Sequence, residues 1–320
     1  MTAIAQPAHP TSPPKKKPRY SKSEKREIKW GLIFISPWII GFLLFTAFPM
    51  IASFIFSITE FNLLQPQDFK FVGLSNYVRL FGDPQVIKSL LITLRFALLS
   101  VPIAILVPLG LALLVNAKNL FGKNVFRAMF FMPQMISAVA IVVVFGGVLN
   151  SQSGWFNRIL GFFGIQGPNW FQDEQWVVPA MALMTVWIVG NTMLTMLAGL
   201  QNVPTELYEA GRVDGASPWR AFWNITVPMI SPIIFYNLIL AFIGSLQYFV
   251  GAFIIGNGRG DPNGATMFFN MYLYKTAFSF LDMGYGATLA WVLFFIGLGL
   301  TIILFRVQNR FVYYASGDQS

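Results

Sequence analysis

The side chains that could catalyse a reaction are few in this sequence. Cysteine is absent, and the single histidine, His9, lies in a polar N-terminal stretch. A zinc site, a thiolate nucleophile or a histidine general base within the apolar part of the chain is therefore excluded. Asp173, Glu174 and Asp68 are the only plausible carboxylates in the expected outer loops. Because adjacent residues do not converge on one bond, we interpret them as solvated loop residues and expect neither a catalytic nor a metal site.

A charged and aromatic segment, residues 204–228, separates two long apolar runs and is the clearest candidate for a functional surface. Pro204 suits a first helical turn, and Glu206 and Glu209 follow near the positive end of that helix's dipole. Gly215 is a natural helix terminator because it accepts a left-handed backbone. The first half of the segment is therefore expected to be a short helix that ends at a tight turn.

The second half of this segment restarts a helix. Ser217 is suited to cap it and Pro218 to occupy its first position, and Pro228 is expected to stop it. Three aromatic residues spaced i, i+3, i+4 form one apolar face, namely Trp219, Phe222 and Trp223. Judged on amphipathicity alone, the segment could equally be an interfacial hairpin with its aromatic side chains in the lipid head groups.

The elements that must position this segment are membrane helices. Hydrophobic residues make up 55% of the 320 residues and charged residues 11%, whereas a typical globular chain has about a quarter of its residues charged. Six charge-free gaps are each long enough for a spanning helix of about 20 apolar residues. They cover residues 30–59, 96–117, 128–157, 175–205, 221–258 and 283–305. The expected fold class is an all-α integral membrane protein with six transmembrane helices in residues 30–310.

The first 29 residues supply most of the net charge of +9. This stretch is rich in Pro, Ser and Lys and lacks a periodic apolar face, so we expect a disordered tail. The basic residues favour a cytoplasmic N-terminus that touches anionic lipid over a nucleic-acid-binding arm. Six helices then return residues 311–320 to the cytoplasm. Outside the tail the basic residues are balanced between the two sides, so the orientation depends on the tail.

The segment 204–228 resembles the EAA loop of ABC importer permeases. Glu-Ala, Gly, Ile and Pro match the motif at its spacing, as Glu209, Ala210, Gly215, Ile225 and Pro228. The string EAGRVDGASPWRAFWNITVP is similar to the carbohydrate-permease version, with Asp214-Gly215-Ala216 in its centre. Gly211 and Val227 depart from the motif, and Gly211 should cost about 1 kcal/mol of helix stability relative to alanine.

The resemblance extends over residues 30–310. The strings FVGLSNYVRLF (71–81), FFMPQMISAVAIVVVFGGVLN (130–150) and LAGLQNVPTELYEA (197–210) are similar to the first permease subunit of maltose- and glycerol-3-phosphate-type systems. Where such relatives carry Gly-Gly-Pro after the fifth helix, this chain has Gly260-Asp261-Pro262. The resemblance implies the type I ABC importer permease fold and a multi-pass protein of the inner membrane.

The resemblance also implies partners and a role for the loop. It implies a second permease, a cytoplasmic ATPase dimer, an extracytoplasmic solute-binding protein and a sugar, expected to be an oligosaccharide. The chain has no phosphate-binding loop, so ATP and Mg would be bound by the ATPase and no cofactor by this chain. In such permeases the loop docks on the ATPase, with Glu209 paired to a basic residue and the aromatic residues as anchors. The implied loop residues are Glu209, Ala210, Gly211, Asp214, Gly215, Trp219, Phe222, Trp223, Ile225 and Pro228.

Polar residues inside the apolar runs are candidates for the solute path, because they are costly elsewhere in a bilayer. The fifth run has Asn237, Ala241, Gly244 and Tyr248 on one helical stripe with Gln247 beside it, and the fourth run has Asn191 and Thr195 four residues apart. Hydrogen bonding and close packing between helices would explain the same residues. A glycerol-3-phosphate or polyol importer remains an alternative. A secondary transporter is a more distant alternative, because no ionisable residue lies inside a run to couple an ion.

Overall fold

The computed structural model describes residues 21–65, 67, 69–308 and 312–313, and these residues are mostly helical. One short antiparallel hairpin pairs β1 (Thr59–Glu60) with β2 (Lys70–Phe71). Four helical segments are long and apolar enough to cross a membrane singly, namely Lys22–Ser57, Pro84–Asn116, Pro218–Ile255 and Met283–Gln308. The expected all-α membrane fold is confirmed. The expected count of six spans holds only if each of two bent helix pairs is one span.

The chain divides into two compact units, residues 1–53 and 54–320. In the first unit, α1 (Lys22–Phe42) runs through a π-helical turn (Leu43–Ala47) into α2 (Phe48–Ser57), whose last four residues belong to the second unit. Residues 1–20 of the expected tail lie outside the described residues. Lys22–Lys29, expected in the same disordered tail, instead form the start of α1. A capping box explains this correction, because the side chains of Ser21 and Glu24 each accept the other's backbone N–H.

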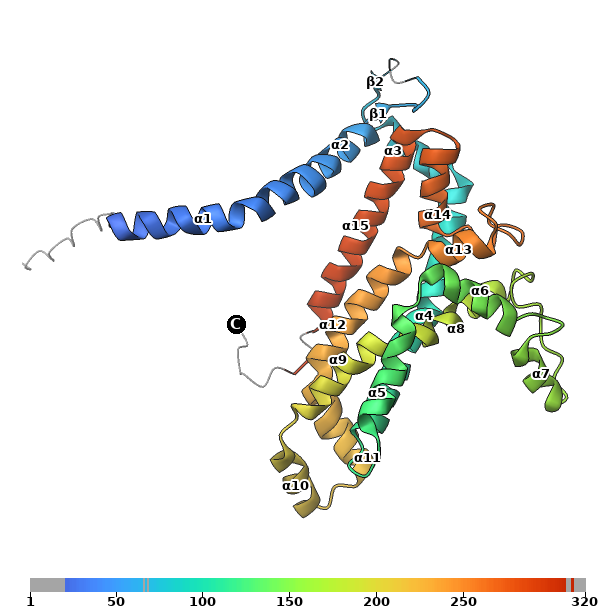
Figure 1. Cartoon of the computed structure of the whole chain (residues 1–320). Coiled ribbons are helices and arrows are strands. Elements are labelled where there is room, and N and C mark those ends of the chain that lie inside the picture. Colours follow the sequence, from blue (N-terminus) through green and yellow to red (C-terminus); the bar gives the residue numbers. More distant parts are fainter. Residues whose placement is uncertain (1–20, 66, 68, 309–311, 314–320) are drawn as a thin grey trace, which may run out of the picture. The chain divides into compact units, whose positions relative to one another are not determined.

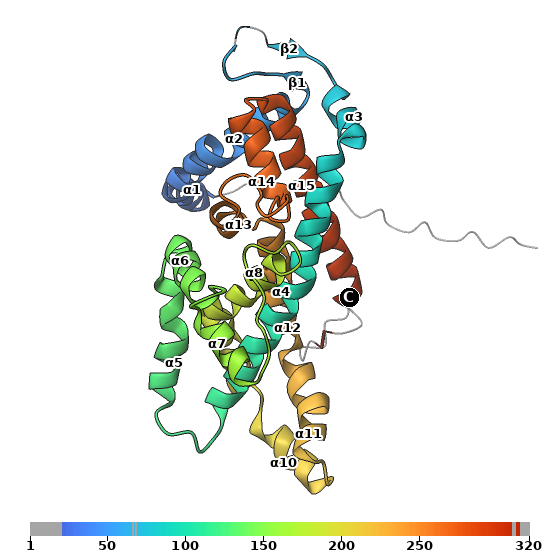
Figure 2. The same ribbon diagram turned by 90° about the vertical axis from the view of Figure 1, so that its right-hand side faces the viewer.

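The second unit is built around three helices that pack together, α4 (Pro84–Asn116), α9 (Gly190–Gln201) and α12 (Val227–Leu246) (Figure 1). Their shared core includes Ile105, Ala112, Met193, Met196 and Ile230. The remaining helices are α3 (Ser75–Gly82), α5 (Lys123–Phe131), α6 (Ala138–Val148), α7 (Trp155–Phe162), α8 (Val177–Met184), α10 (Thr205–Val213), α11 (Pro218–Ala221), α13 (Val250–Ile255), α14 (Phe269–Tyr274) and α15 (Met283–Gln308). Two views place α3 at one end of this unit and α10 and α11 at the other (Figures 1 and 2).

The third and fourth apolar runs each form a bent pair of helices. The third bends by 103° between Met135 and Ala138, where a 3₁₀ turn containing Pro133 is followed by two extended residues. The fourth bends by 54° between Ile188 and Gly190. The side-chain oxygen of Gln134 accepts the Asn191 N–H at 2.8 Å, so the two breaks are joined to each other. Irregular backbone at membrane depth requires such partners.

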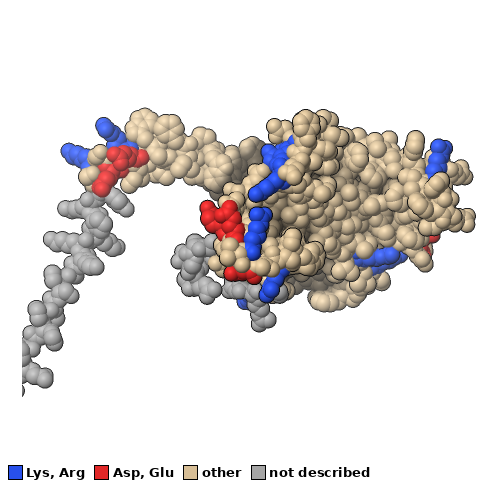
Figure 3. Space-filling model, turned by 90° about the horizontal axis from the view of Figure 1, so that it is seen from below, with Lys and Arg blue, Asp and Glu red and all other residues tan. Residues whose placement is uncertain are grey.

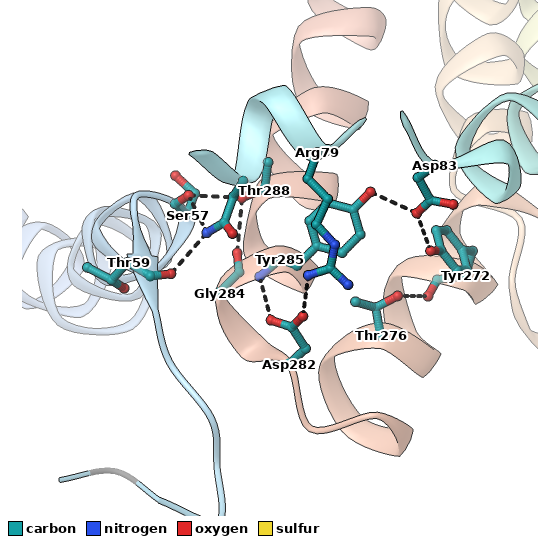
Figure 4. Close-up of polar contacts among 11 residues, drawn as sticks. Ser57, Thr59, Arg79, Asp83, Tyr272, Thr276, Asp282, Gly284, Tyr285 and Thr288 are labelled. Atoms are coloured by element: carbon teal, nitrogen blue, oxygen red, sulfur yellow. Dashed lines mark hydrogen bonds and ion pairs between the residues drawn. The ribbon is translucent and has the colours of Figure 1, made fainter. Parts of the chain in front are cut away.

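A polar network joins α3 and α4 to α14 and α15 (Figure 4). Asp83 caps α4 by accepting the Gln85 N–H at 2.9 Å, and it accepts the hydroxyls of Tyr272 and Tyr285. The only ion pair among the described residues joins Arg79 to Asp282 at 2.6 Å, and the Arg79 guanidinium lies 4.0 Å from the Tyr285 ring centroid. The network ties the first turn of α4 to the start of α15.

The Asp83 carboxylate is favoured over its protonated form. Burial alone would raise the pKa of Asp83, but the hydroxyls of Tyr272 and Tyr285, the Gln85 N–H and the nearby Arg79 together hold its pKa below the ordinary value. Since the pKa is lower in the folded state, the carboxylate stabilises the fold above the ordinary carboxyl pKa of about 4, and this contribution is lost as the pH falls further.

Replacing Asp83 should destabilise this end of the molecule. Asp83→Ala removes a helix cap worth about 1 kcal/mol together with the acceptor of two tyrosine hydroxyls, so the unfolding temperature of the purified chain in detergent should fall. Asp83→Asn keeps one side-chain oxygen for the cap, so its unfolding temperature should lie between those of wild type and Asp83→Ala. The gap between wild type and Asp83→Asn should close as the pH drops below about 4. Equal unfolding temperatures for all three proteins at neutral pH would contradict this role.

Candidate functional site

The segment 204–228 lies at the end of the second unit opposite α3 and begins with α10 (Figures 1 and 2). Pro204 precedes α10 rather than occupying its first turn, because its backbone is extended at ψ 132°. The helix ends in a Schellman motif. The N–H of Ala216 donates to the Gly211 carbonyl at 2.8 Å and the N–H of Gly215 to the Arg212 carbonyl at 3.0 Å. Gly215 has φ +73°, so the predicted tight turn at this glycine is confirmed.

The second helix starts as predicted but does not stop where predicted. Ser217 caps α11 by accepting the Arg220 N–H, with Pro218 at the first position. Pro228 does not end the helix, because the preceding turn, Phe222–Thr226, is a π-helix in which the Val227 N–H reaches the Phe222 carbonyl. A wider turn accommodates a residue that has no N–H to donate. The run therefore continues from Pro218 into α12, and the expectation of a stop at Pro228 is corrected.

Helix α10 is held against the start of this run. The hydroxyls of Tyr208 and Thr226 lie 2.9 Å apart, and Thr226 is buried. A Cβ at Gly211 would lie 3.0 Å from Ile225 Cδ1, so the glycine lets α10 approach the run closely. Tyr208, Phe222 and Ile225 all pack on the core between α4, α9 and α12. The loop and the fifth span are thus joined by a hydrogen bond and by apolar contacts.

The outward side of the segment combines exposed apolar and charged residues. Val213, Trp219 and Trp223 are 89%, 71% and 52% exposed, and the aromatic rings of Trp219, Phe222 and Trp223 lie against one another at centroid distances of 5.1–6.0 Å. Glu209, Ala210 and Asp214 are also exposed, and among the described residues Glu209 has no ion-pair partner. Seen from this end, acidic and basic side chains form small groups on a largely uncharged surface (Figure 3). Such a surface can bind a protein that supplies a complementary charge and apolar pockets.

A small cavity of about 230 Å³ lies between α4, α12 and the bend that precedes α9. Its lining includes Ser100, Thr185, Thr192, Gly244 and Tyr248. Ser100 is 4% exposed, and its hydroxyl has no hydrogen-bond partner among the described residues. A buried hydroxyl without a partner costs about 1–3 kcal/mol, so a hydrogen-bond partner for Ser100 would stabilise this part of α4. None of the described residues that line it is charged.

The residues predicted for the solute path do not all meet. Gly244 and Tyr248 line the 230 Å³ cavity, whereas Gln247 lines a second cavity of about 650 Å³ beside α14 and α15. Asn237 is buried and its amide donates to the Ile233 carbonyl of its own helix at 2.8 Å. Asn191 and Thr195 line neither cavity; the Thr195 hydroxyl donates to the Asn191 carbonyl. Asn237 and Thr195 therefore bond to carbonyls of their own helices, and these bonds are not the hydrogen bonds between helices that the alternative expected.

Sequence reasoning missed Ser100, Thr185 and Thr192. A usable signal was present for Ser100, because Ser89, Thr93 and Ser100 are polar residues at helical spacing at the start of the second span. Ser89 and Thr93 are satisfied, the first by the Val86 carbonyl and the second by the Ser89 carbonyl. Only a structure shows that Ser100 differs from them in having no partner among the described residues.

Known proteins resemble this chain over most of its length. Residues 87–312 match the family model described as binding-protein-dependent transport system inner membrane component. The chain is 36% identical to the probable ABC transporter permease protein YesP of Bacillus subtilis, with 93% of this chain and 96% of that protein covered. It is 33% identical to the arabinooligosaccharides transport system permease protein AraP of the same organism, with 87% and 88% covered. The bacterial alginate ABC transporter, solved in complex with alginate pentasaccharide-bound periplasmic protein, contains a chain with a TM-score of 0.74 at 22% identity, covering 90% and 96%.

Replacing Gly215 should loosen the turn between α10 and α11. An alanine at φ +73° costs about 1–2 kcal/mol, which corresponds to a roughly 5–30-fold larger open population. Trypsin cleavage at Arg212 of the purified chain should accelerate accordingly. Gly211→Ala is the matched control, because it gains helix propensity and displaces only the end of the Ile225 side chain by a few tenths of an ångström. If Gly215→Ala were cleaved no faster than Gly211→Ala, the turn would not depend on glycine.

Proposed function

The chain belongs to the family of binding-protein-dependent transport system inner membrane components, and on this premise we propose that it moves a sugar across the membrane by alternating access driven by a separate ATPase. The predicted carbohydrate permease family, the type I ABC importer permease fold and the multi-pass membrane location are confirmed. The observation that carries the proposal is the helical run from Pro218 to Leu246. It begins in the exposed loop and ends beside the 230 Å³ cavity.

In this proposal, segment 204–228 is the coupling loop and faces the cytoplasm. Glu209 pairs with a basic residue of the ATPase, and Trp219 and Trp223 fill apolar pockets on it. Because Tyr208 and Ile225 hold α10 against the fifth span, a displacement of the loop is passed to α12. The nucleotide-dependent equilibrium of the ATPase is thereby linked to the opening of the solute path.

The transported solute in this proposal is an uncharged, hydroxyl-rich molecule. The cavity offers the free hydroxyl of Ser100 and the aromatic rings of Phe96 and Tyr248, whose centroids lie 4.4 Å apart. Aromatic and hydroxyl groups suit a sugar. An anion would be placed in a span without a cation to pair with it, which is costly. The absence of charge in the cavity lining therefore favours a sugar over glycerol-3-phosphate. We expect the sugar to be an oligosaccharide, as the name of AraP states for that relative.

The proposed complex contains this chain and three other kinds of component. A cavity of 230 Å³ is small for an oligosaccharide, so a second permease completes the path. An ATPase dimer binds ATP and Mg and docks on the coupling loop. In this proposal a solute-binding protein on the opposite side delivers the sugar. The alginate ABC transporter, which was solved in complex with an alginate pentasaccharide-bound periplasmic protein, supports this part of the proposal. Secondary transport is disfavoured, since among the described residues those lining the cavity include no ionisable group for ion coupling other than Tyr248.

Reversing the charge at Glu209 should uncouple the complex. Glu209→Lys is expected to leave the chain in the membrane while its ATPase no longer co-purifies and sugar uptake is lost. Glu206→Lys, one turn earlier on the same exposed helix, is the matched control and should retain most uptake. Normal uptake and normal co-purification of Glu209→Lys would remove the coupling-loop proposal.

Filling the cavity should block transport without disturbing assembly. Ser100→Leu places a larger apolar side chain in the cavity, and uptake of a radiolabelled neutral oligosaccharide should fall by at least about tenfold, which is the loss of 1.4 kcal/mol of binding. Ser89→Ala removes a buried hydroxyl outside the cavity and should transport normally. Unchanged uptake by an assembled Ser100→Leu complex would exclude this cavity from the path, and competition by glycerol-3-phosphate would contradict the uncharged solute.

A further inference from the structure

One wall of the 230 Å³ cavity is a short stretch of irregular helix in the fourth apolar run. Four residues of this stretch line the cavity, namely Thr185, Ile188, Val189 and Thr192. The first two belong to a 3₁₀ turn, and Thr192 lies in the first turn of α9. The run bends by 54° between these two elements. The shape of the cavity therefore depends on what fixes the start of α9.

The start of α9 has no cap from its own segment. A helix start leaves its first N–H groups without intrahelical partners, and the side chain at the N-cap position often accepts one of them. Val189 occupies that position and has no side-chain acceptor. The Asn191 N–H instead donates to the side-chain oxygen of Gln134 at 2.8 Å. Since Gln134 belongs to the third apolar run, α9 is capped by a side chain of another span.

Backbone packing brings the two runs together at the same point. Gly190 is buried, and a Cβ built on it would overlap the Phe130 carbonyl oxygen and lie 2.7 Å from Phe131 Cα. The glycine therefore lets the end of α5 approach the start of α9 closely. Beyond the bend of the third run, the Phe145 ring of α6 meets the Trp187 ring edge-on at a centroid distance of 6.0 Å. Both halves of the third run thus contact the bend of the fourth.

We propose that Gln134 is a positioning residue for the solute cavity. It holds the start of α9, and with it Val189 and Thr192, in the place that sugar binding requires. The described residues that line the cavity do not include Gln134, so it acts through α9. Without its oxygen the Asn191 N–H loses its partner, and the first turn of α9 opens more often. The inference rests on the proposed function in taking this cavity as part of the sugar path.

Hydrogen exchange of the full chain in detergent measures whether Gln134 holds α9. Gln134→Met keeps the length of the side chain and removes the acceptor. Amide exchange in residues 189–193 should become about fivefold faster, the factor for one lost hydrogen bond, while exchange in α12 stays the same. Gln134→Glu keeps an acceptor of the same reach and should exchange like the wild type. Gln201→Met, at the exposed last residue of α9, is the matched control.

Sugar uptake by the assembled complex then measures the effect on the cavity. Gln134→Met should raise the apparent KM for a neutral oligosaccharide by up to about fivefold, because sugar binding loses no more than the lost bond contributed. The maximal rate should stay close to that of the wild type, since the residues of the cavity wall are displaced and not removed. Gln134→Glu should restore the wild-type KM, and Gln201→Met should not change it.

Three results would overturn the proposal. Unchanged exchange in Gln134→Met would mean that Gln134 does not hold α9. A higher KM with unchanged exchange would mean that Gln134 contacts the solute itself. Faster exchange with an unchanged KM would mean that the start of α9 does not shape the sugar site. If the wild type moved no sugar, the proposed function would fail, whereas the exchange measurement would still decide whether Gln134 caps α9.

Discussion

Pro228 has no backbone N–H and would ordinarily end a helix. Here the Val227 N–H reaches back five residues to the Phe222 carbonyl, and this one wide turn carries the helix past the proline. The connection between the exposed loop and the cavity depends on that turn, because it makes α11 and α12 a single run. Tyr208 and Ile225 then hold α10 against the run. A break at Pro228 would leave residues 204–228 as a separate hairpin with no rigid link to the solute path.

The low tolerance of a bilayer for unpaired polar groups accounts for much of the remaining arrangement. Inside the spans, Thr195, Asn237 and Ser245 donate to carbonyls of their own helices. Among the described residues, the buried hydroxyl of Ser100 is an exception because it has no hydrogen-bond partner. That hydroxyl lies beside the 230 Å³ cavity, and none of the described residues that line the cavity is charged. This exception is the one that the proposed sugar path uses.

Local rules predicted the parts of the molecule that short-range interactions determine. The cap at Ser217 and the left-handed turn at Gly215 follow from residue type and spacing. The stop at Pro228 was wrong because tertiary packing of Phe222 and Ile225 favours a continuous helix with a π-turn. The start of α1 at Lys22 was missed because charge and composition suggested disorder, although the Ser21–Glu24 capping box was present in the sequence. The Asp83 network joins residues about 200 positions apart, which no local pattern can predict.

In the proposed mechanism, α10 and the fifth span move as one body when the ATPase binds nucleotide. The absence of cysteine allows pairs of spin labels to be placed without background. In the assembled complex, the distance between labels at Val213→Cys and Leu240→Cys should be the same with and without ATP. The distance between Leu240→Cys and Ile302→Cys on α15 should change. A Val213–Leu240 distance that shifts with ATP while the Leu240–Ile302 distance stays constant would show that the loop moves independently of the span, and would contradict the account.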